Sequence, residues 1–272
     1  MECPRIINMI KSALPPLKVC FIKIFALFFF LTSSANAAVI DVFFAGGQSN
    51  ATEAWLDGLN STLSPHYDNT LVVYQNHPGK WMRYWYSGNA DDANGVPKEG
   101  YDLDFYNSSG TGLLQSELNN ILANGDTYRF NALFWYQGES EVTSAEDISR
   151  YGYRFRSMID QMQSDMSLDP FTYMLAVVDA NRSLISDEKI AEFEAMRSVQ
   201  FEIGNDPLGM SYDVAAGGYN WVDEWHLDEA SARQLGIEMA TAYITAVPVP
   251  SAVWLFGSGL LALIGAARRK KS

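Results

Sequence analysis

The chain has 272 residues, 48% of them hydrophobic and 19% charged, which is enough apolar sequence for the packed core of one large or two small domains. Its 15 Phe, 14 Tyr and 7 Trp residues need burial, and together with the low charge they exclude a disordered chain, a collagen and a coiled coil. The formal net charge of −13 argues against a nucleic-acid partner, because proteins that bind nucleic acid neutralise its phosphates with Lys and Arg.

Residues 1–37 have the pattern of a secretory signal peptide. Four basic residues accompany the short apolar run 24–31 (IFALFFFL), and Ala35-Asn36-Ala37 has the small-residue pattern of a cleavage site. A retained membrane anchor is the weaker alternative, because this run is shorter than the roughly 20 residues that span a bilayer. We expect cleavage before Ala38 and export of the protein. Both cysteines of the chain lie in this segment, so we expect no disulfide and no cysteine-based metal site in the mature protein.

Between residues 38 and 247 the hydrophobic pattern predicts alternating strands and helices in a single domain. Near-continuous apolar runs, typical of strands buried on both faces, occur at 39–45, 71–74, 132–136 and 173–178. Helices are expected at 112–124, 144–166, 186–203 and 228–246. This alternation predicts an α/β fold, a three-layer α/β/α sandwich with a mainly parallel sheet. The body has 11 basic and 31 acidic residues, a formal charge of −20 that favours solubility and repels anionic surfaces.

Three polar motifs lie at the boundaries of these elements, and catalytic groups of such folds gather at the carboxyl ends of the strands. The motifs are Gly46-Gly47-Gln48-Ser49-Asn50, Gln137-Gly138-Glu139-Ser140 and Asp223-Glu224-Trp225-His226. A serine hydroxyl becomes an effective nucleophile when an imidazole takes its proton, and a carboxylate then orients the imidazole. An acid three residues before a histidine can fold back to accept the Nδ1 proton. The order Ser, Asp, His therefore predicts nucleophilic catalysis.

Acyl transfer also needs hydrogen-bond donors for the developing oxyanion. The candidates are the backbone N–H of Ser49, a glycine N–H from a second loop and the side-chain amide of Gln137. Each motif alone has an ordinary interpretation: Ser49 as a turn residue, His226 as a helix-capping residue and Asp223 as a solvated acid. The three motifs in this order favour the catalytic interpretation.

No metal or other cofactor is expected. Two further histidines of the body, His66 and His77, are interpreted as surface or loop residues and are too few for a histidine-rich metal site. The acidic pairs at 91–92 and at 102 and 104 lack a complete calcium-loop signature, so they are interpreted as solvated loop residues.

The run 81–86 (WMRYWY) is the most aromatic stretch of the body. Flat ring faces pack against the C–H face of a sugar, so Trp81 and Trp85 are candidate substrate-binding residues. Packing in the core is an equally good interpretation of both. Trp225, beside His226, is a candidate wall of an acyl pocket, again with core packing as the alternative.

Residues 248–272 form a distinct tail. An apolar segment of 16 residues, 252–267, is followed at once by four basic residues, which fits a short transmembrane segment with its positive end in the cytoplasm. The string VPVPSAVWLFGSGLLALIGAARRKK resembles a PEP-CTERM sorting signal of Gram-negative bacteria, with Val-Pro-Val-Pro in place of Val-Pro-Glu-Pro.

This resemblance implies passage through the export machinery, transient anchoring in the inner membrane and processing by an exosortase-type enzyme. The implied destination is the cell surface or extracellular matrix. A plain C-terminal anchor is the alternative.

The motifs Gly47-Gln48-Ser49-Asn50, Tyr136-Gln137-Gly138-Glu139-Ser140 and Asp223-x-x-His226 resemble blocks I, III and V of the SGNH hydrolases. More narrowly, they resemble the sialate O-acetylesterase and carbohydrate esterase family six branch, where Gln replaces the oxyanion Asn. Over roughly 39–245 the resemblance implies the flavodoxin-like SGNH fold. It also implies Ser49 as nucleophile, His226 as base, Asp223 as its orienting acid and Gln137 as an oxyanion donor.

The same resemblance implies supporting roles for Gln48, Asn50 and Glu139, the last as a residue that orients its loop. The block II glycine is assigned to Gly110, with Gly112 as the rival, because Leu113 replaces the proline of the expected G-x-G-P element. A further departure is Ala51, where the branch often has Met.

The resemblance implies a serine esterase that removes O-acetyl groups from a carbohydrate through an acyl-Ser49 intermediate. The expected address makes an acetylated exopolysaccharide a plausible substrate. Two alternatives stay open: an esterase or lipase that acts on other acyl esters, and a non-catalytic glycan-binding surface protein on the same scaffold.

Overall fold

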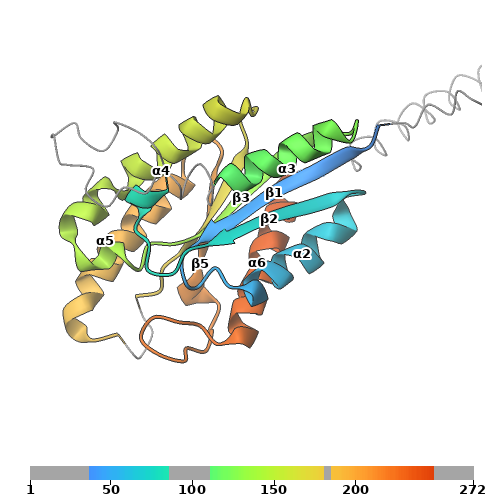
Figure 1. The fold of residues 1–272 in the computed structure, drawn as a ribbon. Helices are drawn as coiled ribbons and strands as arrows, with labels where there is room; N and C mark the ends of the chain where they lie inside the picture. The colour runs from blue at the N-terminus through green and yellow to red at the C-terminus, as the bar shows by residue number, and fades with distance from the viewer. Residues whose placement is uncertain (1–36, 86–110, 181–184, 248–272) are drawn as a thin grey trace, which may run out of the picture. The chain divides into compact units, whose positions relative to one another are not determined.

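The computed structural model describes residues 37–85, 111–180 and 185–247 (Figure 1). Its centre is a five-stranded sheet in the order β2-β1-β3-β4-β5, and every neighbouring pair is parallel. The strands are β1 (Val39–Gly47), β2 (Thr70–Asn76), β3 (Thr127–Tyr136), β4 (Thr172–Val177) and β5 (Gly209–Asp213). The helices are α2 (Glu53–Leu63), α3 (Thr111–Ala123), α4 (Ala145–Met166), α5 (Asp187–Gly204) and α6 (Glu229–Ala246). The predicted three-layer α/β fold is confirmed.

Helices cover both faces of the sheet and divide the core in two (Figure 1). Side chains of β1 alternate between the two sides: Phe44 packs with the core under α3, α4 and α5, whereas Phe43 packs with the core under α2 and α6. Both phenylalanines are fully buried. A strand with two buried faces is apolar at nearly every position, which is why β1 shows no polar alternation; its one charged residue, Asp41, is paired with Arg129.

The four predicted strands and four predicted helices are present: three strands are longer than predicted, and the bounds of the other elements differ by one residue. Helix α2 and strand β5 were not predicted. The sequence of α2 (EAWLDGLNSTL) has Gly, Asn, Ser and Thr at positions where good helix formers are expected, and that of β5 (GMSYD) is short and half polar. Packing of α2 against α6 and pairing of β5 with β4 stabilise these segments.

The predicted transmembrane segment 252–267 lies outside the described residues, as does the predicted signal peptide up to residue 36. Among the described helices, none combines the length and the hydrophobicity needed to cross a bilayer.

The chain turns sharply at Gly47, the last residue of β1. Its φ is +151°, and a Cβ at this position would lie 1.9 Å from the carbonyl oxygen of Tyr136 on the neighbouring strand. Only glycine allows β1 to end so close to β3. The two glycines of the first motif thus include one that the backbone requires.

We predict that Gly47→Ala lowers the free energy of unfolding by roughly 2–4 kcal/mol, because the new methyl group meets a backbone carbonyl that cannot rotate away. Gly125→Ala is the matched control: its φ is +83°, but no atom lies within 4 Å of the added Cβ. This control should lose only about 1 kcal/mol. Urea denaturation of both variants tests the difference, and equal losses would contradict it.

Candidate active site

The site lies where the adjacent strands β1 and β3 end. Gly47 pairs with Tyr136 at the last register position of the two strands. The backbone N–H of Gln48 then donates to the Tyr136 carbonyl at 3.0 Å, so the loop after β1 begins against the end of β3. This parallel register places Ser49 next to the loop that follows Gln137.

Ser49, His226 and Asp223 form a connected chain of hydrogen bonds. The Oγ of Ser49 lies 3.0 Å from Nε2 of His226, although 177 residues separate them in sequence. On the other side of the ring, Nδ1 lies 2.9 Å from Oδ2 and 3.0 Å from Oδ1 of Asp223. A neutral imidazole with its proton on Nδ1 therefore accepts from the serine hydroxyl and donates to the carboxylate. This is the geometry that general-base activation of a serine requires.

Hydrogen bonds lower the pKa of Asp223 to about 2. The largest cause is the bond from the His226 ring, followed by the bond from the backbone N–H of Trp225. The carboxylate oxygen Oδ1 also accepts the backbone N–H of His226 at 2.8 Å. Asp223 is therefore ionised at neutral pH and ready to stabilise an imidazolium, although its side chain is 53% exposed.

Asn50 lies beside the nucleophile and is buried. Its Nδ2 donates to Oε1 of Glu139 at 2.6 Å and to the carbonyl of Trp225 at 2.7 Å, and its Oδ1 accepts the N–H of Leu227 at 3.0 Å. Glu139 is buried as well. The first and third motifs are thus joined by a side-chain hydrogen bond, and Asn50 connects both to the histidine loop.

Gln48 and Gln137, both buried, have different surroundings. The Oε1 of Gln48 lies 3.4 Å from the backbone N–H of Ser140, and Gln48 lines the cavity at Ser49. The Nε2 of Gln137 donates instead to the carboxylate of Glu141 and weakly to the carbonyl of Lys80.

The predicted oxyanion role of Gln137 is not matched by this geometry. Its side chain is fully buried and does not line the cavity, because its amide is engaged by Glu141. The predicted glycine donor Gly110 lies outside the described residues, and its rival Gly112 lies in the first turn of α3.

A cavity of about 280 Å³ opens at Ser49 and His226. Its other lining residues are Gln48, Pro78, Gly79, Glu139, Ser140, Thr143 and Trp225. Trp225 therefore does form a wall of the pocket. Its ring lies 5.9 Å from that of Phe193, and Nζ of Lys189 lies 4.4 Å from the ring centre, so both α5 residues hold it in place.

The substrate-binding prediction for Trp85 is wrong. Trp85 is fully buried, with its ring 4.6 Å from that of Trp135 in an edge-to-face contact. Trp81 is half-buried under the guanidinium of Arg83, 4.4 Å from its ring, and does not line the cavity at Ser49. In this aromatic run the core-packing alternative holds for Trp85.

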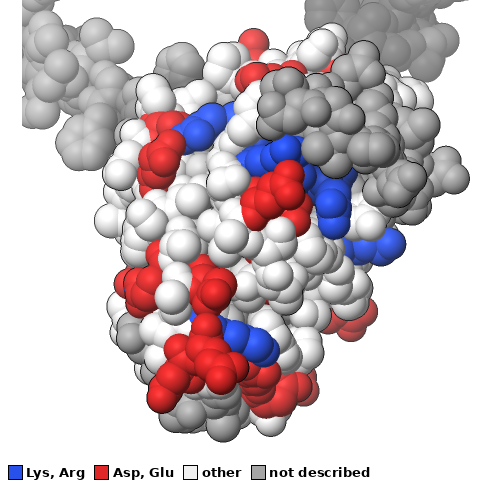
Figure 2. All heavy atoms as spheres, turned by 90° about the vertical axis from the view of Figure 1, so that its left-hand side faces the viewer, with Lys and Arg blue, Asp and Glu red and all other residues white. Residues whose placement is uncertain are grey.

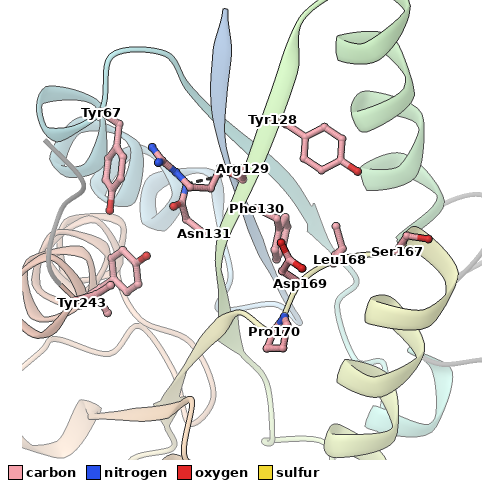
Figure 3. A pocket seen from close by; sticks show the side chains of 11 residues that line it. Tyr67, Tyr128, Arg129, Phe130, Asn131, Ser167, Leu168, Asp169, Pro170 and Tyr243 are labelled. Atoms are coloured by element: carbon pink, nitrogen blue, oxygen red, sulfur yellow. Dashed lines mark hydrogen bonds between the residues drawn. The ribbon is translucent and has the colours of Figure 1, made fainter. Parts of the chain in front are cut away.

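A larger cavity, of about 470 Å³, lies at the other end of the strands, where β3 and β4 begin (Figure 3). It is lined by the first residues of β3, the segment before β4, and the rings of Tyr67 and Tyr243. Arg129 extends along it and binds Asp41 at 2.7 Å through Nε. None of the three triad residues lines this cavity, so size alone does not identify the reactive site.

Within the described ranges, no group of three or more His, Cys, Asp or Glu side chains is arranged to hold a metal ion. His77 contacts the ring of Trp85 at 5.4 Å and Nε2 of Gln75 at 2.6 Å.

Behind the cavity lies a buried carboxyl group that the sequence did not single out. Glu141 is fully buried and accepts hydrogen bonds from the backbone N–H of Met82 and from the amide of Gln137. Burial raises its pKa to about 7, although these two bonds and the charge of Arg154 act in the opposite direction. Through Met82, Glu141 fixes the segment that follows Pro78 and Gly79 in the cavity wall.

Because the folded-state pKa of Glu141 is raised, its protonated form stabilises the fold below about pH 4.5, and this contribution is lost as the pH rises through about 7. We predict that Glu141→Gln removes this part of the pH dependence of stability. In Glu202→Gln, where the carboxylate is 71% exposed, the dependence should match wild type. Urea denaturation from pH 4 to 8 is the measurement; parallel curves for wild type and Glu141→Gln would contradict the assignment.

The comparisons with known proteins agree with this fold and place the chain in a family. Residues 96–245, more than half of the chain, match the family described as carbohydrate esterase, sialic acid-specific acetylesterase. The chain therefore belongs to this carbohydrate esterase family. The matched range includes Asp223 and His226 and begins after Ser49, so the nucleophile is assigned from sequence motif and geometry.

A probable carbohydrate esterase of Arabidopsis thaliana is 25% identical over 114 residues, 42% of this chain and 40% of that protein. The chain thus aligns with less than half of that curated relative.

Three solved structures share the fold. An Arabidopsis thaliana protein has a TM-score of 0.54 and 14% identity, over 75% of this chain and 98% of that one. A carbohydrate acetylesterase from Xanthomonas citri has a TM-score of 0.52 and 15% identity, over 75% of this chain and 56% of that one. NanS has a TM-score of 0.51 and 12% identity, over 77% of this chain and 98% of NanS.

Proposed function

We propose that this carbohydrate esterase is an exported serine esterase that removes O-acetyl groups from a saccharide. The observation that carries the proposal is the 3.0 Å contact between Ser49 Oγ and His226 Nε2 at the mouth of a small cavity, with Asp223 on the far side of the ring. The family to which the chain belongs supports the type of reaction, the removal of an acetyl ester from a carbohydrate.

The proposed reaction has two acyl transfers. His226 takes the proton of Ser49 as Oγ attacks the ester carbonyl, and the imidazolium then returns that proton to the departing sugar oxygen. The product is acetyl-Ser49 and a free sugar hydroxyl. Water, deprotonated by the same imidazole, attacks the acetyl group; the bond between Ser49 Oγ and the acyl carbon then breaks, the imidazolium returns the proton to Oγ, and acetate is released. Asp223 stabilises the imidazolium in both steps, and the Ser49 N–H is one candidate donor for the oxyanion.

We predict that Ser49→Ala abolishes acetate release from both 4-nitrophenyl acetate and an acetylated polysaccharide. Asp223→Asn should lower kcat by about 10²–10⁴-fold, because the imidazole loses the partner that fixes its tautomer. Acetate release is the measurement. Full activity in Ser49→Ala would refute the mechanism. Glycan binding without release by the wild type would support the non-catalytic alternative.

The cavity volume supports a short acyl group. About 280 Å³ must hold the reacting ester and part of the sugar, and Trp225 closes one side. We predict that kcat/KM for acetyl esters exceeds that for butyryl esters by at least about 10-fold, since each extra methylene would meet this wall. Trp225→Ala enlarges the cavity and should lower the ratio of kcat/KM for acetyl esters to that for butyryl esters. A wild-type preference for butyryl or longer esters would favour the lipase alternative.

The proposed address is the cell surface or extracellular matrix, supported by the signal-peptide pattern and by the sorting-signal-like tail. Two structural features agree with a polymeric substrate there. Ala38 bonds to the start of β3 and Val247 lines the cavity at that same edge, whereas Ser49 follows the other end of β1. A tail anchored after Val247 would leave Ser49 about 30 Å away along β1, open to the surroundings.

The surface on the side of the carboxyl ends is shown in Figure 2, where acidic side chains gather toward the lower part of the view and basic ones lie mainly above. With a formal charge of −20 on the body, a strongly anionic polymer is repelled over most approaches. A neutral acetylated saccharide meets no such barrier and is the substrate class we propose.

A further inference from the structure

The side chains of His226 and Asp223 are not held in place by burial. The side chain of His226 is 41% exposed and that of Asp223 is 53% exposed. Hydrogen bonds within the loop fix its shape: the N–H of Val222 donates to the His226 carbonyl at 2.9 Å, and Asp223 accepts the N–H groups of Trp225 and His226. These bonds move with the loop, so they do not set the distance from the imidazole to Ser49.

One buried side chain connects this loop to the nucleophile. The amide of Asn50 binds the carbonyl of Trp225 and the N–H of Leu227, the two residues on either side of His226. Asn50 is 1% exposed, and its second amide hydrogen is used by Glu139. Both donors and the acceptor of one amide are thus engaged, which determines which way the amide faces.

We propose that Asn50 is the positioning residue of the catalytic base: it holds the backbone on both sides of His226 at a fixed distance from Ser49. Ser49 and Asn50 are consecutive, so the nucleophile and this clamp belong to one rigid turn. The side chain of Asn50 thus connects the turn that carries Ser49 directly to the two neighbours of His226. A displacement of about 1 Å would cost about 100-fold in rate.

The other contacts of the loop are less suited to this task. Lys189 reaches Glu224 at 2.7 Å and lies over the Trp225 ring, but its side chain is long and 37% exposed. Exposed ion pairs of this kind contribute little to stability. The N–H of Asn220 donates to the Ser231 hydroxyl at the base of the loop, six residues from His226. Phe193 and Lys189 contact the ring of Trp225, whereas the Asn50 bonds act on the backbone of both residues adjacent to the imidazole.

Glu139 holds the amide of Asn50 in its orientation. Its carboxylate faces the Asn50 amide at 2.6 Å, inside the protein, so Asn50 cannot rotate without leaving a buried carboxylate poorly solvated. This assigns Glu139 a task in the proposed mechanism: besides lining the cavity, it acts on the base through Asn50. The inference rests on the proposed esterase activity.

The first test compares Asn50→Ala with Asn131→Ala. Asn131 makes the same kinds of bond, to the Asp41 carboxylate at 2.9 Å and the Arg129 carbonyl at 3.2 Å, at the opposite edge of the sheet. With 4-nitrophenyl acetate, Asn50→Ala should lose about 100-fold in kcat with KM within about threefold. Asn131→Ala should keep wild-type kcat. A kcat of Asn50→Ala within twofold of wild type, or equal losses in both variants, would overturn the proposal.

A second readout does not depend on turnover. In ¹H–¹⁵N NMR, the imidazole Nδ1 proton of His226, bonded to Asp223, should give a slowly exchanging resonance in wild type and Asn131→Ala. This resonance should broaden in Asn50→Ala as the loop moves. An unchanged resonance in Asn50→Ala overturns the clamp, whereas an inactive wild type with this behaviour overturns only the esterase function.

The double variant Asn50→Asp with Glu139→Gln separates positioning from folding. It reverses the donor and the acceptor of the 50–139 hydrogen bond, and a carboxylate then faces the Trp225 carbonyl. Thermal stability should return toward wild type relative to Asn50→Asp alone, while kcat stays low. Recovery of full kcat would show that the bond to Trp225 is dispensable and would overturn the proposal.

Discussion

The parallel pairing of β1 with β3 is the constraint on which the site depends. Its register ends at Gly47 and Tyr136, so two loops far apart in sequence leave the sheet at the same place. Ser49 and Asn50 follow one strand, and Glu139 follows the other. The pairing shifts by one residue between Val42 and Phe43 and then continues to this end, where Phe43 and Phe44 pack into opposite layers.

Five polar side chains are buried in the loops that follow the carboxyl ends of β1 and β3. Gln48, Asn50, Gln137, Glu139 and Glu141 are each less than 4% exposed. Such burial is tolerated only when the groups bind one another or the backbone, as most of their polar atoms do here. The result is a rigid polar layer beneath an exposed His–Asp pair. In the mechanism we propose, this layer fixes the positions of the reacting atoms, and the exposure above it gives a bulky saccharide access.

Much of the fold was predictable from the hydrophobic pattern. The central strands are buried on two faces and are almost continuously apolar, and the long helices α4 and α6 have buried residues at helical spacing. Helix α2 and strand β5 were not predicted from this pattern: α2 contains Gly58 and Asn60, and β5 pairs only at an edge of the sheet. Their structure follows from packing against their neighbours, the apolar strands and α6, rather than from local propensity.

The sequence by itself predicted the chemistry of the proposed mechanism: a serine, an acid and a histidine, in that order, in motifs at element boundaries. The tertiary structure decided which side chains meet. It buried Trp85 and placed Trp225 at the cavity, because packing on Trp135 or on Phe193 depends on neighbours distant in sequence. It turned the Gln137 amide toward Glu141 and seated Asn50 on both sides of His226, since hydrogen-bond geometry exists only once the loops have come together.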